Sequence, residues 1–204
     1  KAVRKICDEK GILLIADEVQ SGFGRTGKLF ASEYWKENGC APDIIATAKS
    51  IAGGAPLSAV IASKEVMDAG GTIGGTYGGN ALACAAGLEV LKLMDEGGLV
   101  KRSQEIGKKV MAAFNEMKEK YEVVGDVRGL GAMIGVEFVK DKKTKEPNPE
   151  FVGKFIQECA KNGLLVENAG IYGNVIRFLA PLVITDAQLD AGLEIYENAI
   201  KACM

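Results

Sequence analysis

The residue whose position most clearly suggests chemistry is Lys49. It follows a short apolar run, residues 44–47, which begins after Pro42 and gives way to Gly53 and Gly54. Small and β-branched residues of this kind are typical of a strand buried on both faces. Ligands bind at the carboxyl ends of strands in α/β sheets, and a lysine held there among apolar neighbours can attack a carbonyl group. The alternative is an ordinary lysine in a surface loop.

A second apolar run, residues 11–16, also carries charge only at its carboxyl end, where Asp17 follows. If the two runs are neighbouring strands, Asp17 and Lys49 face one crevice. A lysine that forms a Schiff base and a carboxylate that keeps a pyridine nitrogen protonated are the pair that pyridoxal 5′-phosphate (PLP) needs. Asp17 taken by itself could instead cap the strand end or form a salt bridge, so the two roles stay open at this point.

Composition narrows the classes of protein. The chain has 204 residues, is 48% hydrophobic and has a net charge of −2, which gives no sign of a nucleic-acid or anionic-membrane partner. It has no histidine, which excludes catalysis by a Ser-His-Asp or Cys-His group and any histidine-ligated metal site within the chain. Five cysteines without a C-x-x-C pair are typical of free thiols in a reducing compartment, so we expect a cytoplasmic protein.

Five blocks, in one order across nearly the whole chain, resemble a known family. The likeness is to the class III (omega) aminotransferases of fold type I, which depend on PLP, and above all to those that act on 4-aminobutyrate. The blocks are residues 17–27 (DEVQSGFGRTG), 48–54 (AKSIAGG), 75–80 (GTYGGN), 125–131 (GDVRGLG) and 174–182 (NVIRFLAPL).

The resemblance implies an α/β fold, in which the chain is the C-terminal part of a fold type I transferase. Residues 1–97 then form part of the PLP-binding large domain and its sheet, and residues 98–204 form the small C-terminal α+β domain. The glycines at residues 97–98 mark the expected boundary. The chain lacks an initiator methionine and matches only the second half of the family, so we expect the loop that holds the cofactor phosphate to lie outside it.

Roles for four residues near the two strand ends follow from the resemblance. Lys49 holds the cofactor as a Schiff base and moves the substrate proton, and Asp17 pairs with the pyridinium nitrogen. Val19 and Gln20 contact the cofactor, Gln20 on the side of its 3′ oxygen. No metal is implied.

Two further residues are assigned in the same way. Thr76 corresponds to a threonine that reaches across a dimer interface to the cofactor phosphate of the neighbouring subunit, which implies a homodimer or a dimer of dimers. Arg177 corresponds to the arginine that binds the substrate carboxylate, a task suited to the bidentate guanidinium. An arginine in a strand otherwise usually lies on the solvent face.

The implied reaction transfers an amino group from an omega-amino acid, 4-aminobutyrate first among them, to 2-oxoglutarate. Another class III activity, on ornithine or acetylornithine, is one alternative, and a catalytically incompetent fragment is another. A nucleotide-binding oxidoreductase is the third, because residues 22–27 match G-x-G-x-x-G after a strand and Asp43 lies about 20 positions further on.

The remaining pattern predicts alternating helices and strands. A capping box at residues 185–188 predicts the start of a terminal helix, and apolar residues along residues 82–91 predict a face packed into the core. Helices are expected near residues 1–10, 29–38, 80–95, 99–121 and 150–162, and further strands near residues 56–63, 123–127, 132–139, 164–167 and 175–178.

Overall fold

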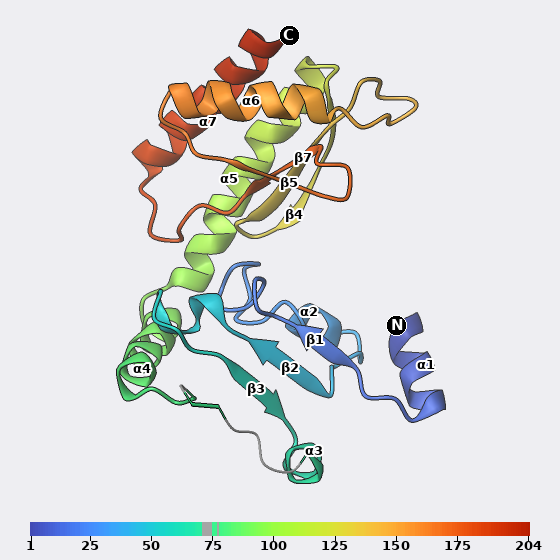
Figure 1. Ribbon diagram of the computed structural model, residues 1–204, viewed down its shortest axis with the longest axis vertical. Coiled ribbons are helices and arrows are strands. Elements are labelled where there is room, and N and C mark those ends of the chain that lie inside the picture. Colours follow the sequence, from blue (N-terminus) through green and yellow to red (C-terminus); the bar gives the residue numbers. More distant parts are fainter. Residues whose placement is uncertain (71–74, 77) are drawn as a thin grey trace. The chain divides into compact units, whose positions relative to one another are not determined.

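The computed structural model describes residues 1–70, 75–76 and 78–204, and its elements fall into two compact units, Lys1–Lys101 and Arg102–Met204 (Figure 1). The assignment of residues 1–97 and 98–204 to a cofactor-binding and a small domain stays a prediction.

The first unit is built around a sheet of order β1-β2-β3. Central strand β2, which leads to Lys49, pairs in parallel with β1. It pairs antiparallel with β3, the strand that was expected beside it. The described elements are α1 (Ala2–Lys10), β1 (Ile15–Asp17), α2 (Glu33–Lys36), β2 (Ile44–Thr47), the 3₁₀ helix η1 (Lys49–Ala52), β3 (Ala59–Ala62), α3 (Lys64–Ala69) and α4 (Ala81–Asp95).

Local sequence explains where these helices begin and end. Helix α1 stops at Gly11, whose φ of 64° places it in the left-handed region that favours glycine. Helix α4 begins after Asn80, whose side chain accepts a hydrogen bond from the Ala83 amide at 3.1 Å. Both ends were predicted from sequence and are confirmed.

The predicted burial of this unit is wrong in two places. The strands are not buried on both faces, since Ile15 is 60% exposed. On α4 the residues expected to pack into the core are open, with Leu82 80% and Leu88 68% exposed. The small residues Ala83 and Gly87 are buried instead, and Gly87 lies against η1, where an added Cβ would be 3.3 Å from the Ile51 carbonyl oxygen.

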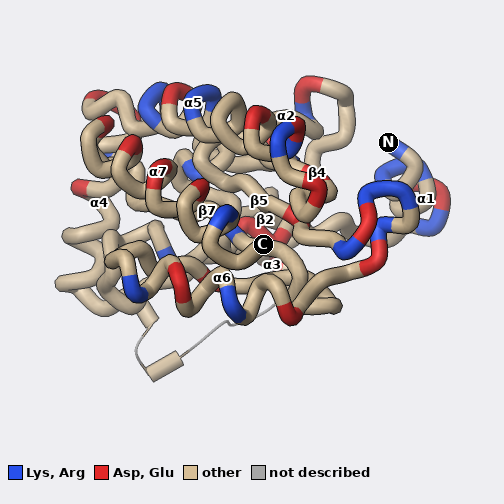
Figure 2. The backbone as a smooth tube through the Cα atoms, turned by 90° about the horizontal axis from the view of Figure 1, so that it is seen from above, with Lys and Arg blue, Asp and Glu red and all other residues tan. Residues whose placement is uncertain are grey.

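The second unit is an antiparallel sheet of order β4-β5-β7-β6 with three helices. Its elements are the main part of α5 (Leu99–Lys120), β4 (Val124–Leu130), β5 (Met133–Phe138), α6 (Pro149–Lys161), β6 (Glu167–Ala169), β7 (Val175–Phe178) and α7 (Asp186–Cys203). In Figure 2 basic and acidic residues are interspersed along α5. Helix α7 begins with the predicted capping box of Thr185 and Gln188, which is confirmed.

Aromatic residues join the helices of this unit to one face of the sheet. Phe114 of α5 meets Phe178 of β7 edge to face, with ring centroids 6.1 Å apart. Phe138 of β5 meets Phe155 of α6, which in turn meets Tyr196 of α7. Aromatic rings bury large areas and favour such tilted contacts, so this cluster is the core of the unit.

Two predicted strand boundaries in this unit are wrong. Residues 128–130 continue β4 instead of forming a loop, because they pair with β5 up to Leu130 opposite Met133. Strand β6 begins at Glu167, not at Leu164. The Leu164 amide donates to the Cys159 carbonyl at 2.9 Å and so closes the end of α6, which removes it from the sheet.

A glycine in α5 permits a close approach of two backbone segments in the second unit. A Cβ added at Gly107 would lie 2.2 Å from the Gly131 carbonyl oxygen in the β4–β5 turn. We expect Gly107→Ala to lower the free energy of unfolding by about 1–3 kcal/mol, measured by urea denaturation, because helix and turn must separate. The matched control is Gly153→Ala in α6, where nothing lies within 4 Å and a small gain is expected. Equal effects at the two positions would contradict this packing.

Acid should loosen the contact between α5 and α7. Glu197 accepts hydrogen bonds from Lys120 Nζ at 2.5 Å and from the Tyr121 hydroxyl at 2.7 Å, and these bonds lower the pKa of its carboxyl to about 2. A lowered carboxyl pKa stabilises the fold above the unfolded pKa of about 4.3, and this gain is lost as the pH falls toward 2. As the pH falls from about 4.3 toward 2, Glu197→Gln should therefore lose less free energy of unfolding than wild type, measured by urea denaturation. The same slope in Glu197→Gln as in wild type, or an equal change in the exposed control Glu194→Gln, would contradict this.

Candidate active site

The two residues with the clearest predicted chemistry lie at one edge of the first sheet. Strands β1 and β2 run parallel with Asp17 opposite Ala46, and Lys49 begins η1 directly beyond the carboxyl end of β2. Both Asp17 and Lys49 are exposed. A carboxylate and an amine therefore stand at the ends of adjacent parallel strands, where α/β sheets bind ligands.

The backbone at Lys49 is strained. Its φ is 48°, a left-handed value that costs a residue with a side chain roughly 1–2 kcal/mol. The chain reaches it through Ala48, with φ −160° and ψ −145°, and leaves η1 through Gly53, with φ 59°. Strain of this kind in a non-glycine residue is often kept at functional sites.

A backbone turn follows β1 directly. Asp17 Oδ1 accepts a hydrogen bond from the Val19 amide at 3.0 Å, so one carboxylate oxygen of Asp17 sets the local backbone. Val19 and Gln20 are half-buried in this turn. The three residues predicted to contact a cofactor from this side are thus brought together, and their contacts with it stay a prediction.

Glu18 is a residue of this site that the sequence analysis missed. Its side chain is 1% exposed, and its carboxylate accepts hydrogen bonds from the Ser32 and Ala31 amides and the Ser21 hydroxyl. The signal was present in the period-two alternation of a strand, which puts Glu18 on the same side as buried Ala16 and opposite Asp17.

The structure rules against the dinucleotide-binding alternative. That fingerprint needs its glycines to open a helix whose amino end meets a phosphate. Residues 22–27 form turns and a bend, and α2 begins only at Glu33 and has four residues. Asp43, which would have to contact a ribose, instead accepts hydrogen bonds from the Leu14 amide at 2.6 Å and Arg4 Nη1 at 2.7 Å.

Thr76 lies in the glycine-rich segment before α4 and is exposed. Its neighbour Tyr77 and residues 71–74 lie outside the described residues. A contact between Thr76 and the phosphate in a neighbouring subunit stays a prediction.

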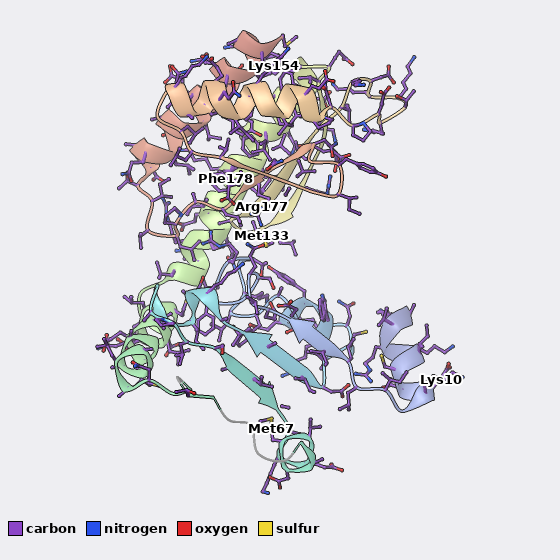
Figure 3. All side chains as sticks on the ribbon, in the orientation of Figure 1. Lys10, Met67, Met133, Lys154, Arg177 and Phe178 are labelled. Atoms are coloured by element: carbon purple, nitrogen blue, oxygen red, sulfur yellow. The ribbon has the colours of Figure 1, made fainter. Side chains whose placement is uncertain are left out.

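Arg177 belongs to the second unit, on β7 beside Phe178 (Figure 3). It pairs across the sheet with Glu167, whose Oε2 lies 2.8 Å from Arg177 Nη2, and its side chain is 32% exposed. Arg177 and Glu167 line a pocket of 390 Å³ whose other walls are mostly apolar, including Phe114 and Leu189. A guanidinium at the wall of an apolar pocket is suited to a carboxylate on an otherwise apolar ligand.

The described residues lack two further kinds of feature. No described helix combines the length and the apolar content that a bilayer crossing requires. No cluster of three or more cysteine, aspartate or glutamate side chains suited to a metal ion occurs in that part of the chain.

Comparison with known proteins places this geometry in a family. Residues 1–200 match the model of the family described as aminotransferase class-III. The chain is 49% identical over 200 residues to 5-aminovalerate aminotransferase of Pseudomonas putida, covering 97% of this chain and 46% of that protein. It is 48% identical over 195 residues to 4-aminobutyrate aminotransferase of Escherichia coli, covering 95% of this chain and 45% of that protein.

A relative with a different named activity is nearly as similar. The leucine/methionine racemase of Thermococcus litoralis is 46% identical over 202 residues, covering 98% of this chain and 44% of that protein. Among solved structures, an amine transaminase from an uncultivated Pseudomonas species, in a PLP-bound form, superposes with a TM-score of 0.87 and 35% identity, covering 99% of this chain and 47% of that chain.

The chain spans about half the length of the curated relatives it matches. The family model, however, covers nearly the whole of the chain, and both named aminotransferases match almost all of it. The chain belongs to the class III aminotransferase family.

Proposed function

We propose that this chain forms part of a PLP-dependent aminotransferase that moves an amino group from an omega-amino acid to 2-oxoglutarate. The observation that carries the proposal is the placement of Asp17 and Lys49 at the carboxyl ends of adjacent parallel strands. Family membership supports it, as do the names of the two relatives, 5-aminovalerate and 4-aminobutyrate aminotransferase.

The residues present fit the cofactor. PLP requires an amine for its aldehyde carbon and an acid partner for its ring nitrogen, and Lys49 and Asp17 are such a pair on one sheet edge. When bound, PLP supplies an electron sink that stabilises negative charge on the substrate carbon next to the reacting nitrogen.

In this proposal Lys49 has two tasks. Its Nζ would hold the cofactor covalently and, once a substrate amine had displaced it, would take the proton from the substrate carbon and deliver it to the cofactor carbon that the lysine had held. Asp17 would place its carboxylate beside the ring nitrogen. Its other oxygen is already fixed by the Val19 amide, so the carboxylate is held in one orientation.

The other assigned residues bind and orient. Val19 and Gln20 would lie against the cofactor, Thr76 would bind the phosphate of a neighbouring subunit in a homodimer or dimer of dimers, and Arg177 would bind the substrate carboxylate. The free state of all five cysteines supports a cytoplasmic location.

The donors that we propose first are 4-aminobutyrate and 5-aminovalerate, because relatives named for them are 48–49% identical to this chain. Both donors carry an amine at one end of an apolar chain and a carboxylate at the other. Ornithine or acetylornithine remains an alternative donor. The second candidate function is amino-acid racemisation, which the racemase at 46% identity favours and which would begin with the same removal of a proton by Lys49.

An absorbance experiment on the intact gene product loaded with PLP tests the proposal. We expect a visible band from the bound cofactor that 4-aminobutyrate or 5-aminovalerate bleaches and 2-oxoglutarate restores, with glutamate formed. Bleaching only by ornithine or acetylornithine would change the donor, and inversion of leucine or alanine without use of the oxo acid would favour the racemase. A protein that never acquires the band would refute the proposal.

A further inference from the structure

The proposed reaction leaves one buried acid without a task. The Glu18 carboxylate accepts a hydrogen bond at Oε1 from the Ser32 amide, 2.6 Å away, and two at Oε2, from the Ala31 amide at 3.0 Å and the Ser21 hydroxyl at 2.5 Å. A buried carboxylate is costly unless such donors replace water. The three donors come from both ends of the segment 21–32, so the carboxylate closes this segment into a loop.

The backbone of Glu18 is fixed as firmly as its side chain. Its amide donates to the Ala46 carbonyl at 2.8 Å, which extends the pairing of β1 with β2 one residue beyond Asp17. Its carbonyl oxygen accepts from the Gly22 amide at 3.0 Å, and a Cβ at Gly22 would lie 2.8 Å from that oxygen. Glu18 therefore joins the sheet, the turn and the loop at one residue.

We propose that Glu18 is a positioning residue for the cofactor site. By tying the loop 21–32 to the end of β1, it fixes the direction in which Asp17 and Gln20 face the site. Consecutive residues of an extended chain point to opposite sides, so the burial of Glu18 is what keeps Asp17 on the open side. This inference rests on the proposed function, because the direction of Asp17 matters only if a cofactor binds there.

Glu18→Gln tests this with little change in shape. Glutamine keeps one acceptor oxygen, but its NH₂ group would face donors that now meet Oε2, among them the Ala31 amide. The matched control is Ser103→Ala in the second unit. The Ser103 hydroxyl is fully buried and also accepts from a backbone amide, that of Ala132 at 3.1 Å.

Two properties of the intact gene product are measured for each variant. One is the Kd of PLP, from titration of the visible band, together with the pH dependence of that band. The other is the rate at which trypsin cuts the cofactor-free protein after Arg25 and Lys28, which lie inside the loop. We expect Glu18→Gln to weaken PLP binding by about tenfold or more, to shift the pH dependence and to speed the cuts by a similar factor. Ser103→Ala should lower the melting temperature and leave the PLP affinity, the pH dependence of the band and the cutting rate unchanged.

The outcomes separate the two proposals. A wild-type protein without a visible band would overturn the proposed function and this inference with it. A wild type with the band beside a Glu18→Gln variant of equal PLP affinity and pH dependence would overturn this inference alone, even if the loop were cut faster. If Glu18→Gln does not fold, Ser21→Ala carries the test. A loss of PLP affinity of about threefold or more would then support the inference, and unchanged affinity would overturn it.

Discussion

Replacing Lys49 with alanine is expected to abolish both the visible band of the bound cofactor and transamination, with a loss of activity of about 10⁴-fold or more. The reason is that one amine performs two steps, the covalent attachment of the cofactor and the transfer of the substrate proton. Lys49 lies just beyond β2, beside the carboxyl end of β1. Among the described residues no second lysine lies at this strand end.

The comparison that makes this result specific uses another exposed lysine of the same unit. Lys10 lies in the last turn of α1 (Figure 3), and Lys10→Ala should keep the band and the activity. Added methylamine should restore part of the proton transfer in Lys49→Ala, since a free amine can replace the missing base. A Lys49→Ala protein that keeps the band would refute the assignment of the cofactor lysine.

The edge of the first sheet was predictable because the relevant signals are local. An apolar β-branched run indicates a strand, and the residue after it stands at the carboxyl end whatever the rest of the fold does. This is why the places of Asp17 and Lys49 followed from residues 11–17 and 44–49 alone. The capping box at Thr185 was predictable for the same reason.

The burial of side chains was less predictable, because it depends on which distant segments of the chain pack against them. The apolar residues of α4, such as Leu82 and Leu88, look like a core stripe in the sequence, yet the described residues of this chain do not cover them. Glu18 shows the opposite failure. An acid that directly follows another acid, Asp17, looks exposed in the sequence, and the distant backbone donors at Ala31 and Ser32 help to offset the cost of burying it.

Arg177→Ala is expected to raise KM for 2-oxoglutarate and to lower kcat/KM by about 30-fold to several thousand-fold, since truncating one member of a desolvated charge pair costs roughly 2–5 kcal/mol. Arg177→Lys should recover only a small part of this loss, because an ammonium group cannot form the bidentate contact. The control is Arg128→Ala, at an arginine of the same sheet that is held by Asp126 at 2.9 Å and Glu137 at 2.6 Å. It should change KM by less than about threefold.

The ion pair between Arg177 and Glu167 predicts that replacing Glu167 changes KM in the opposite direction. A substrate carboxylate must share or displace the Glu167 carboxylate, which lies 2.8 Å from the guanidinium. Glu167→Gln removes the competing charge, so KM for 2-oxoglutarate should fall while Arg177→Ala raises it. Because Glu167 is largely exposed, this gain should be a few-fold at most and should shrink as salt is added. An unchanged KM in both variants would mean that the substrate carboxylate binds elsewhere.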